Sequence, residues 1–275
     1  LADALIDAGL DTLRVSLQGL SSEKYATICK ARVNFEELLE NLRYFYAHRG
    51  KTKLFLKVMD VALEEGEDEK FYALFSDMTD RMYIEHMLPA YDGVELTQGM
   101  EVEYDRYGGK TEGIRKVCPL AFYMLGVFPN GDVEPCDTIY KPIVLGNVHE
   151  MRILDMWHGE KLREFWQLQL AGRREENKRC AHCCAPNDVA HPEDVLDGAA
   201  EEILARLAMK AVRIDGQTPG GKRQRLADRL PLDTPFSIQV FPVYACNLAC
   251  AYCIHSVPLE ERGFIAAKTV LDMRL

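Results

Sequence analysis

The sequence predicts an α/β fold with a second, smaller domain that is rich in cysteine. Short apolar runs of strand length, at residues 12–19, 53–59 and 82–88, alternate with helical patterns. Nine cysteines occur in 275 residues, and seven of them fall in two separate groups. A chain of this length can form one large domain and one small one.

The first elements follow in order along the chain. Residues 1–9 carry apolar side chains at helical spacing and end at Gly9, a residue that suits the left-handed end of a helix. Residues 12–19 alternate as a strand and leave it at a glycine. Asn34, with Glu37 three residues later, predicts a capped helix. We expect its buried stripe to contain Phe35, Leu38, Leu39, Leu42, Phe45 and Tyr46.

Two further strands are expected at residues 53–59 and 82–88, with an acidic helix over residues 64–78 between them. The strands are apolar except for a few side chains, among them Lys57, Glu85 and His86. Because successive side chains of a strand point to opposite faces, Glu85 and His86 cannot both face one interior.

The first cysteine group lies near the end of the chain. Cys246, Cys250 and Cys253 are spaced CxxxCxxC. Three thiolates at this spacing can hold three irons of a [4Fe–4S] cluster and leave the fourth iron open to an exogenous ligand. A zinc knuckle or a redox CxxC is the alternative, for which Cys250 and Cys253 alone would suffice.

This loop resembles that of the radical S-adenosylmethionine (SAM) superfamily, as do the apolar strand expected at residues 236–243 and Tyr252, which precedes the third cysteine. The resemblance implies a partial (β/α)6 radical SAM barrel, with SAM bound to the open iron and Tyr252 as a cofactor contact. It also implies reductive cleavage of SAM to a 5′-deoxyadenosyl radical.

Residues 12–19 resemble the strand of that superfamily with a Ser-Leu-Asp-Gly signature, although Gln18 replaces the aspartate. By this resemblance Ser16 and Gln18 are SAM contacts; a plain strand serine is the alternative for Ser16. Arg14 shares the face of Ser16 and is either a partner of the SAM carboxylate or a member of an ion pair at the core edge.

The second cysteine group contains Cys118, Cys136, Cys180 and Cys183. Gly131 lies twelve residues after Cys118 and four before Cys136, counting the residues between them. We expect residues 129–131 to form a hairpin turn that brings Cys118 and Cys136 side by side. A helix over residues 155–169 then returns the chain to the CxxC pair.

This spacing, together with residues 145–157, resembles the SPASM/twitch extension of radical SAM enzymes. The resemblance implies that the four thiolates hold one auxiliary [4Fe–4S] cluster. Since only Cys184 follows the CxxC pair, we expect the shorter twitch form with a single auxiliary cluster. Structural zinc at the four cysteines is the alternative.

The resemblance also implies a rotated chain order, because radical SAM proteins carry the three-cysteine loop near the N-terminus. Residues 209–275 are then the first part of the barrel, residues 1–95 its later part, residues 96–192 the twitch/SPASM domain and residues 193–208 a C-terminal helix. Part of the barrel, including a Gly-Gly-Glu-Pro-type loop, is absent from this sequence.

The implied function is dehydrogenation of a small, polyhydroxylated, sugar-like or aminocyclitol-like substrate, with the auxiliary cluster accepting an electron. Lys57, Glu85 and His86 are candidates for the general base. Epimerisation with Cys184 or Cys29 as hydrogen donor is an alternative, although Cys29 is expected in the core. A crosslinking peptide maturase and a non-enzymatic iron–sulfur or zinc scaffold are further alternatives.

Composition narrows the partners. A formal charge of −10 argues against nucleic acid, and we expect the short basic runs at residues 173–174 and 222–225 to lie in solvated loops. No apolar run approaches membrane-spanning length and no signal-like start occurs, so we expect a cytoplasmic redox enzyme away from membranes. An external reductant such as flavodoxin or ferredoxin is implied.

Overall fold

A computed structural model of the chain describes residues 2–86, 115–138, 141–181, 183, 185–188, 191–208 and 224–242. The described residues fall into two compact units, residues 2–86 and residues 115–242. Each unit has its own hydrophobic core.

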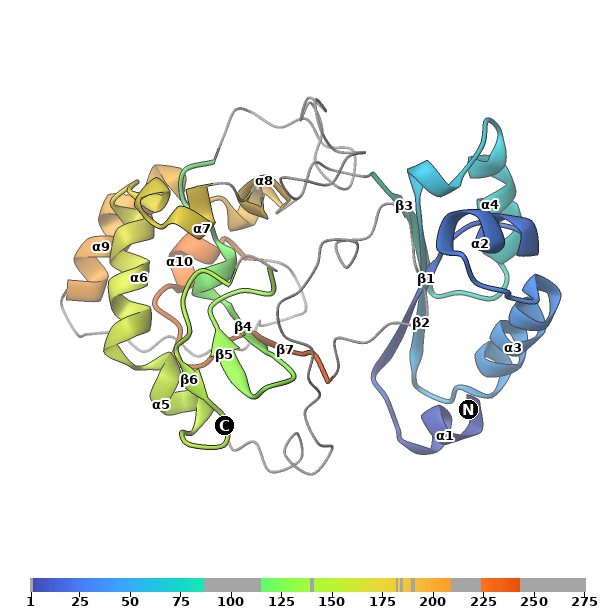
Figure 1. Cartoon of the computed structure of the whole chain (residues 1–275), viewed down its shortest axis with the longest axis horizontal. Helices are drawn as coiled ribbons and strands as arrows, with labels where there is room; N and C mark the ends of the chain where they lie inside the picture. The colour runs from blue at the N-terminus through green and yellow to red at the C-terminus, as the bar shows by residue number, and fades with distance from the viewer. Residues whose placement is uncertain are drawn as a thin grey trace. The chain divides into compact units, whose positions relative to one another are not determined.

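The first unit is built on a parallel sheet with the strand order β1-β2-β3. Its elements are α1 (Ala2–Asp7), β1 (Thr12–Leu17), α2 (Ser22–Cys29), α3 (Phe35–His48), β2 (Lys53–Met59), η1 (Asp60–Ala62), α4 (Glu67–Phe75) and β3 (Arg81–Glu85). Helices α2, α3 and α4 lie on one face of this sheet (Figure 1). A parallel strand connection almost always has the same hand, so successive crossovers place their helices on the same side.

The alternation of β2 decides which face is covered. Leu54, Leu56 and Val58 are buried against the helices, whereas Phe55 and Lys57 between them are half-buried. Helix α3 begins as expected, since the side chain of Asn34 accepts a hydrogen bond from the Glu37 N–H at 3.3 Å. The expected stripe is confirmed: Phe35, Leu39, Leu42 and Phe45 are buried, and Leu38 and Tyr46 are partly buried.

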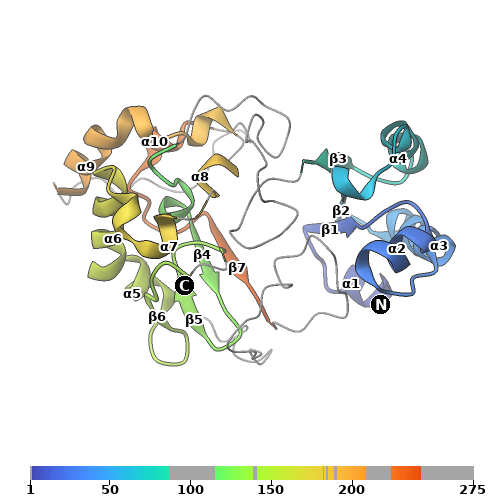
Figure 2. The same ribbon diagram turned by 45° about the horizontal axis from the view of Figure 1, so that its top comes forward.

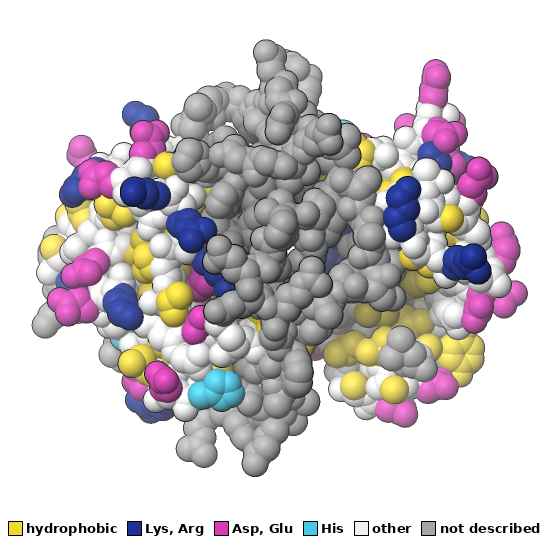
Figure 3. Space-filling model, viewed as in Figure 1, with side chains coloured by type: hydrophobic (Ala, Val, Ile, Leu, Met, Phe, Trp, Pro, Cys, Tyr) yellow, Lys and Arg dark blue, Asp and Glu magenta, His cyan; other side chains and the backbone are white. Residues whose placement is uncertain are grey.

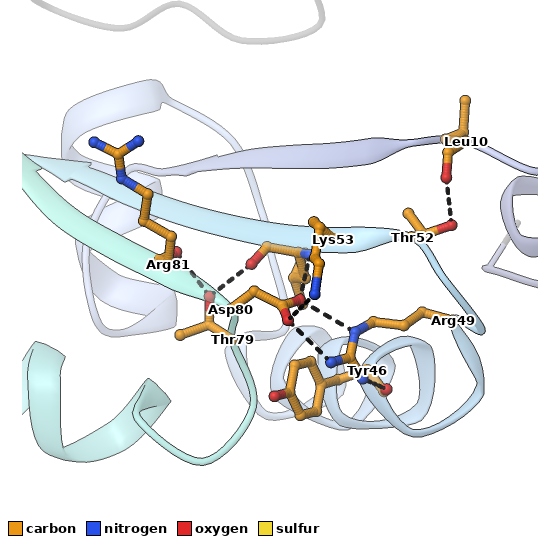
Figure 4. Close-up of polar contacts among 9 residues, drawn as sticks. Leu10, Tyr46, Arg49, Thr52, Lys53, Thr79, Asp80 and Arg81 are labelled. Carbon is orange, nitrogen blue, oxygen red and sulfur yellow. Dashed lines mark hydrogen bonds and ion pairs between the residues drawn. The ribbon is translucent and has the colours of Figure 1, made fainter. Parts of the chain in front are cut away.

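An ionic cluster at the amino edge of this sheet joins α3 to the strands. The carboxylate of Asp80 accepts a hydrogen bond from the Leu54 N–H at 2.8 Å and pairs with Arg49 at 3.2 Å and Lys53 at 3.4 Å (Figure 4). The Thr79 hydroxyl lies within hydrogen-bond distance of the carbonyls of Leu54 and Arg81. These contacts tie the start of β2 and the end of α3 to the residues just before β3.

The second unit contains a four-stranded sheet with the order β6-β5-β4-β7. The strands are β4 (Met124–Val127), β5 (Asp132–Glu134), β6 (Gly146–Asn147) and β7 (Ser237–Val240). The antiparallel β4–β5 hairpin confirms the expected turn, in which Gly131 has a φ of +88° and its N–H donates to the Phe128 carbonyl at 2.8 Å. That φ favours glycine.

Strand β7 differs from expectation in the sheet that it joins. The sequence placed residues 236–243 in the barrel with the strands of the first unit, but β7 pairs in parallel with β4. The physical reason is the packing of Ile238 and Val240 against the core of the second unit.

Helices cover the core of the second unit, as Figures 1 and 2 show from two directions. They are α5 (Ile153–Trp157), α6 (Glu160–Leu170), α7 (Lys178–Ala181), α8 (Ala185–Asp188), α9 (Ala200–Ala208) and α10 (Leu226–Arg229), with 3₁₀ turns η3 (Leu120–Phe122), η4 (Arg174–Glu176), η5 (Pro192–Asp194) and η6 (Asp197–Ala199). The single helix expected over residues 155–169 is divided at Gly159. A β-carbon there would lie 3.1 Å from the carbonyls of Asp155 and Met156.

Aromatic rings pack against one another within the core of this unit. Trp166 stacks on Phe122 at 5.7 Å between ring centroids and meets Trp157 edge-on at 5.2 Å. Both indole N–H groups are satisfied, by the carbonyls of Ala121 and Leu232. On the outside, acidic and basic side chains are interspersed over the described parts of the face in Figure 3. Among the described helices, none has the length and apolar character to cross a membrane.

Candidate metal centre

Four cysteines of the second unit line one pocket. Cys118, Cys136, Cys180 and Cys183 surround about 350 Å³ of space that includes the pocket's opening. The remaining lining is mostly apolar, with Gln169, Arg174 and Arg179 among the polar exceptions. The sequence grouped these cysteines by spacing, and the fold brings them together from three separate segments.

The β4–β5 hairpin positions Cys136. In its register Gly126 lies opposite Glu134, and a β-carbon at Gly126 would meet the Cys136 carbonyl oxygen at 2.6 Å. The chain carrying Cys136 therefore folds back directly over β4, which only a glycine at position 126 permits. The Cys136 sulfur also lies 3.4 Å from the Thr138 hydroxyl.

Gln169 of α6 joins two cysteine segments. Its side-chain carbonyl accepts a hydrogen bond from the Cys118 N–H at 3.3 Å, and its amide lies 3.8 Å from the Cys180 sulfur. Gln169 is fully buried. A buried amide held at both ends fixes the separation of Cys118 and Cys180.

The CxxC pair is held by Asn177 and Arg174. The Asn177 side-chain oxygen accepts from the Arg179 and Cys180 N–H groups at 3.0 and 3.2 Å, which starts α7. The Arg174 guanidinium donates to the carbonyls of Cys180 and Cys183. We expected residues 173–174 in a solvated loop, and for Arg174 this was wrong, because its side chain is drawn into the pocket by those two carbonyls.

The thiols need a cation to ionise. Burial raises the pKa of Cys118 to about 12, with the nearby Cys183 adding to the effect. Burial likewise raises the pKa of Cys180 to about 11 and that of Cys136 well above its usual value. At neutral pH these groups are thiolates only when a metal centre stabilises the negative charge.

The donor set of this pocket is four thiols. Four thiolates can hold one [4Fe–4S] cluster, with each thiolate on a different iron, or a single zinc ion with four sulfurs at about 2.3 Å. The residues that line the pocket therefore fit an iron–sulfur cluster and fit structural zinc as well.

Glu134 is a buried carboxyl beside this centre that the sequence analysis did not single out. It is fully buried, and neither of its carboxyl oxygens has a hydrogen-bond partner among the described residues. Burial raises its pKa to about 8. Its place in an alternating strand two residues before Cys136 was visible in the sequence, but the burial of its face was not.

The remaining candidate residues lie on the first unit. The strand register puts Ser16 beside Lys57, with Arg14 two residues earlier on the same face of β1. This is the face opposite to the helices, and Arg14 and Ser16 are exposed there. Gln18 follows the strand, and its N–H donates to the Tyr25 hydroxyl at 3.2 Å.

Lys57 pairs with Glu85, whereas His86 pairs with Asp60. The Lys57 ammonium lies 2.6 Å from the carboxylate of Glu85, which is 4% exposed. His86 leaves the strand and places its Nδ1 atom 3.0 Å from a carboxylate oxygen of Asp60, just after β2. Asp60 and His86 thus meet at the carboxyl edge of the parallel sheet, a pairing that no sequence spacing indicated.

Several predicted residues lie outside the described part of the chain. These are the cysteines of the first group, Cys246, Cys250 and Cys253, the adjacent Tyr252, and the candidate hydrogen donor Cys184. The other thiol considered as a donor, Cys29, is fully buried in the first unit, as expected of a core residue.

Comparison with known proteins agrees with the geometry of the pocket. The family model of SPASM, an iron–sulfur cluster-binding domain, matches residues 118–184, a segment that contains all four cysteines. No curated protein matches the chain. Among solved structures, a selenomethionine form of BtrN in an open conformation is similar at 16% identity, with 66% of this chain and 75% of that chain covered and a TM-score of 0.27. A TM-score this low supports no conclusion about fold or function.

Proposed function

We propose that this chain is an iron–sulfur enzyme of the radical SAM class, in which Cys118, Cys136, Cys180 and Cys183 hold an auxiliary [4Fe–4S] cluster. The observation that carries the proposal is that the four cysteines within the SPASM match line one pocket. The matching family model describes an iron–sulfur cluster-binding domain, which favours a cluster over structural zinc at these thiols.

The SAM-binding cluster is assigned to Cys246, Cys250 and Cys253 on the spacing of the sequence alone. When bound, this cluster and SAM would supply a carbon radical able to abstract hydrogen from an unactivated C–H bond. Ser16 and Arg14, exposed on the face of β1 opposite to the helices, are proposed contacts for the polar end of SAM.

The proposed reaction is dehydrogenation of a small polyhydroxylated substrate. Four protein thiolates leave no iron of the auxiliary cluster open, so this cluster is suited to accepting an electron and not to binding substrate. Net oxidation of a hydroxyl carbon releases two electrons and two protons in all, and one of those protons needs a base. Flavodoxin or ferredoxin is the proposed external reductant.

His86 is the proposed base. A carboxylate on Nδ1 orients the imidazole and leaves Nε2 for proton transfer, and His86 lies at the carboxyl edge of the sheet, where parallel α/β folds carry their chemistry. Glu85 is less suited, because its carboxylate is already engaged by the Lys57 ammonium. We expect H86Q to lower product formation by about a hundredfold and K57M to change it less.

The test is anaerobic reconstitution with iron and sulfide, followed by dithionite and SAM. The proposal expects about eight irons per chain, for two clusters, and formation of 5′-deoxyadenosine. The matched control is the variant C246A/C250A/C253A, which should retain about four irons and form no 5′-deoxyadenosine. About four irons in the wild-type chain without SAM cleavage would contradict the enzymatic proposal.

A further inference from the structure

Arg174 is a buried cation in the pocket of the four cysteines. Its side chain is 9% exposed, and it lines the same pocket as the cysteines. Its described hydrogen bonds go to two neutral acceptors, the carbonyls of Cys180 and Cys183. These acceptors satisfy the N–H groups without neutralising the charge.

The neighbouring arginine provides a contrast within the same turn. Arg173 forms a bidentate pair with Glu176, with both distances 2.6 Å, and the side chains of this pair are 60% and 55% exposed. Its charge is therefore both paired and screened by water. Among the described residues, Arg174 has no carboxylate partner, and its side chain is buried away from water.

A buried charge of this kind requires compensation. Isolated guanidinium groups are costly to bury, and no carboxylate of the described residues forms an ion pair with Arg174. The pocket that Arg174 lines contains the four cysteines, and its guanidinium contacts the backbone of two of them. A cluster bound to these cysteines would carry net negative charge and would supply the compensation.

We propose that Arg174 is a positioning residue that also raises the reduction potential of the auxiliary cluster. A cluster held by four thiolates carries net negative charge and becomes one unit more negative when it takes up an electron. A fixed positive charge in a water-poor pocket stabilises the reduced form more than the oxidised form. Gln169, whose amide lies 3.8 Å from the Cys180 sulfur, acts in the same direction.

This inference rests on the proposed function and gives it a direction. A cluster with a raised potential is an electron acceptor, which agrees with oxidation of the substrate and not with epimerisation, a reaction without net electron loss. The same guanidinium fixes the CxxC loop through its two carbonyls. Substitutions at Arg174 can separate the effect of its charge from its effect on the position of the CxxC loop.

The test uses the full chain with C246A/C250A/C253A in the background, so that only the second cysteine group binds iron. The midpoint potential of the cluster is measured by redox titration with electron paramagnetic resonance. We expect R174Q to lower the ratio of reduced to oxidised cluster at a fixed potential by about tenfold, equivalent to about 59 mV for one electron. R174K, which keeps the charge, should stay within about twofold of the parent. R173Q, which removes the exposed charge, is the matched control and should leave the potential unchanged.

The outcomes separate the two proposals. If the parent variant binds no cluster, the proposed function of this site fails. If the cluster forms and R174Q has the parent's potential, the function stands and the inference about Arg174 is overturned. Should R174Q fail to assemble a cluster, R174K decides: normal iron content with the parent's potential supports the need for the charge, and loss of iron in both variants reduces Arg174 to a structural role and overturns the proposal.

Discussion

The two units bury polar groups in different ways. In the first unit the buried polar side chains are partnered within the protein: the Thr52 hydroxyl donates to the Leu10 carbonyl at 2.6 Å, and Glu85 pairs with Lys57. In the described part of the second unit Glu134 has no hydrogen-bond partner, the hydrogen bonds of Arg174 go to carbonyls, and burial raises the pKa of the thiols of Cys118, Cys136 and Cys180. Among the described residues, the first unit therefore partners its buried polar side chains within the chain, whereas the second leaves a buried carboxyl without a partner and gathers four cysteines around one pocket.

The largest effect is expected when cysteine ligands of the proposed cluster are removed. The double variant C118A/C136A should lower the iron content from about eight to about four per chain, because two of four ligands to one cluster are lost. Amide hydrogen exchange should accelerate in residues 115–208 and stay unchanged in residues 2–86. Iron analysis and exchange mass spectrometry measure both.

The control for that variant is C29A, which removes a buried thiol from the first unit. It should keep about eight irons per chain. Equal exchange rates in the two units of C118A/C136A would contradict the comparison.

A second variant tests whether the first unit can be destabilised without loss of iron from the second. Leu56 is fully buried, at 0% exposure, in the core of the first unit. L56A should lower the free energy of unfolding of that unit by about 2–5 kcal/mol, because a core cavity is left behind. Urea unfolding followed in the reconstituted protein measures it. The iron content should not change, and a parallel loss of iron would show that the two units are not independent.

A third variant acts on the hairpin. G126A places a β-carbon 2.6 Å from the Cys136 carbonyl oxygen, so β4 and the cysteine segment must move apart. We expect the second unit to lose about 1–3 kcal/mol of stability and the cluster to be released more readily to a chelator. G198A is the matched control, since a β-carbon there meets nothing within 4 Å. Equal rates of iron release in the two variants would refute the prediction.

The smallest effect concerns the ionic cluster at the amino edge of the first sheet. Burial alone would raise the pKa of Asp80, but the Leu54 N–H, Arg49 and Lys53 outweigh burial and hold that pKa below its usual value. Because the folded pKa is depressed, the stabilisation is present above the unfolded pKa of about 3.9 and is lost as the pH falls through the lower folded pKa. D80N should cost about 1–2 kcal/mol at pH 7.

The pH dependence of unfolding checks this prediction. The difference between wild type and D80N should shrink as the solution is acidified below about pH 4. D155N, which removes an exposed ion pair with Arg152, should leave the stability nearly unchanged at every pH. A D80N effect that stays constant down to the acid limit would exclude the assigned role of the carboxylate.

Local signals in the sequence predicted local structure. The Asn34 cap, the alternation of residues 53–59 and the turn at Gly131 each depend on neighbours close in the chain, and the structure confirms them. The grouping of the four cysteines in one pocket was also within reach, since their spacing constrains how the chain returns. Features that depend on contacts between distant residues could not be predicted from the sequence.

The sequence could not show which sheet β7 joins, because an apolar strand packs equally well on either core until the cores exist. Nor could it show that Arg174 is buried while Arg173 is exposed, since adjacent arginines look alike and only the two cysteine carbonyls distinguish them. The Asp60–His86 contact joins the ends of two strands and has no spacing of its own. Each of these depends on tertiary contacts.

The parallel pairing of β4 with β7 has a consequence for how the chain is made. Met124 lies beside Ser237, about 110 residues later, and Trp157 donates to the Leu232 carbonyl. During synthesis the second unit therefore lacks an edge strand and an indole partner until residue 240 has been translated, whereas the first unit is closed once β3 is made. Non-local parallel pairing is slow to form, so we expect β7 to be the last strand to join this sheet.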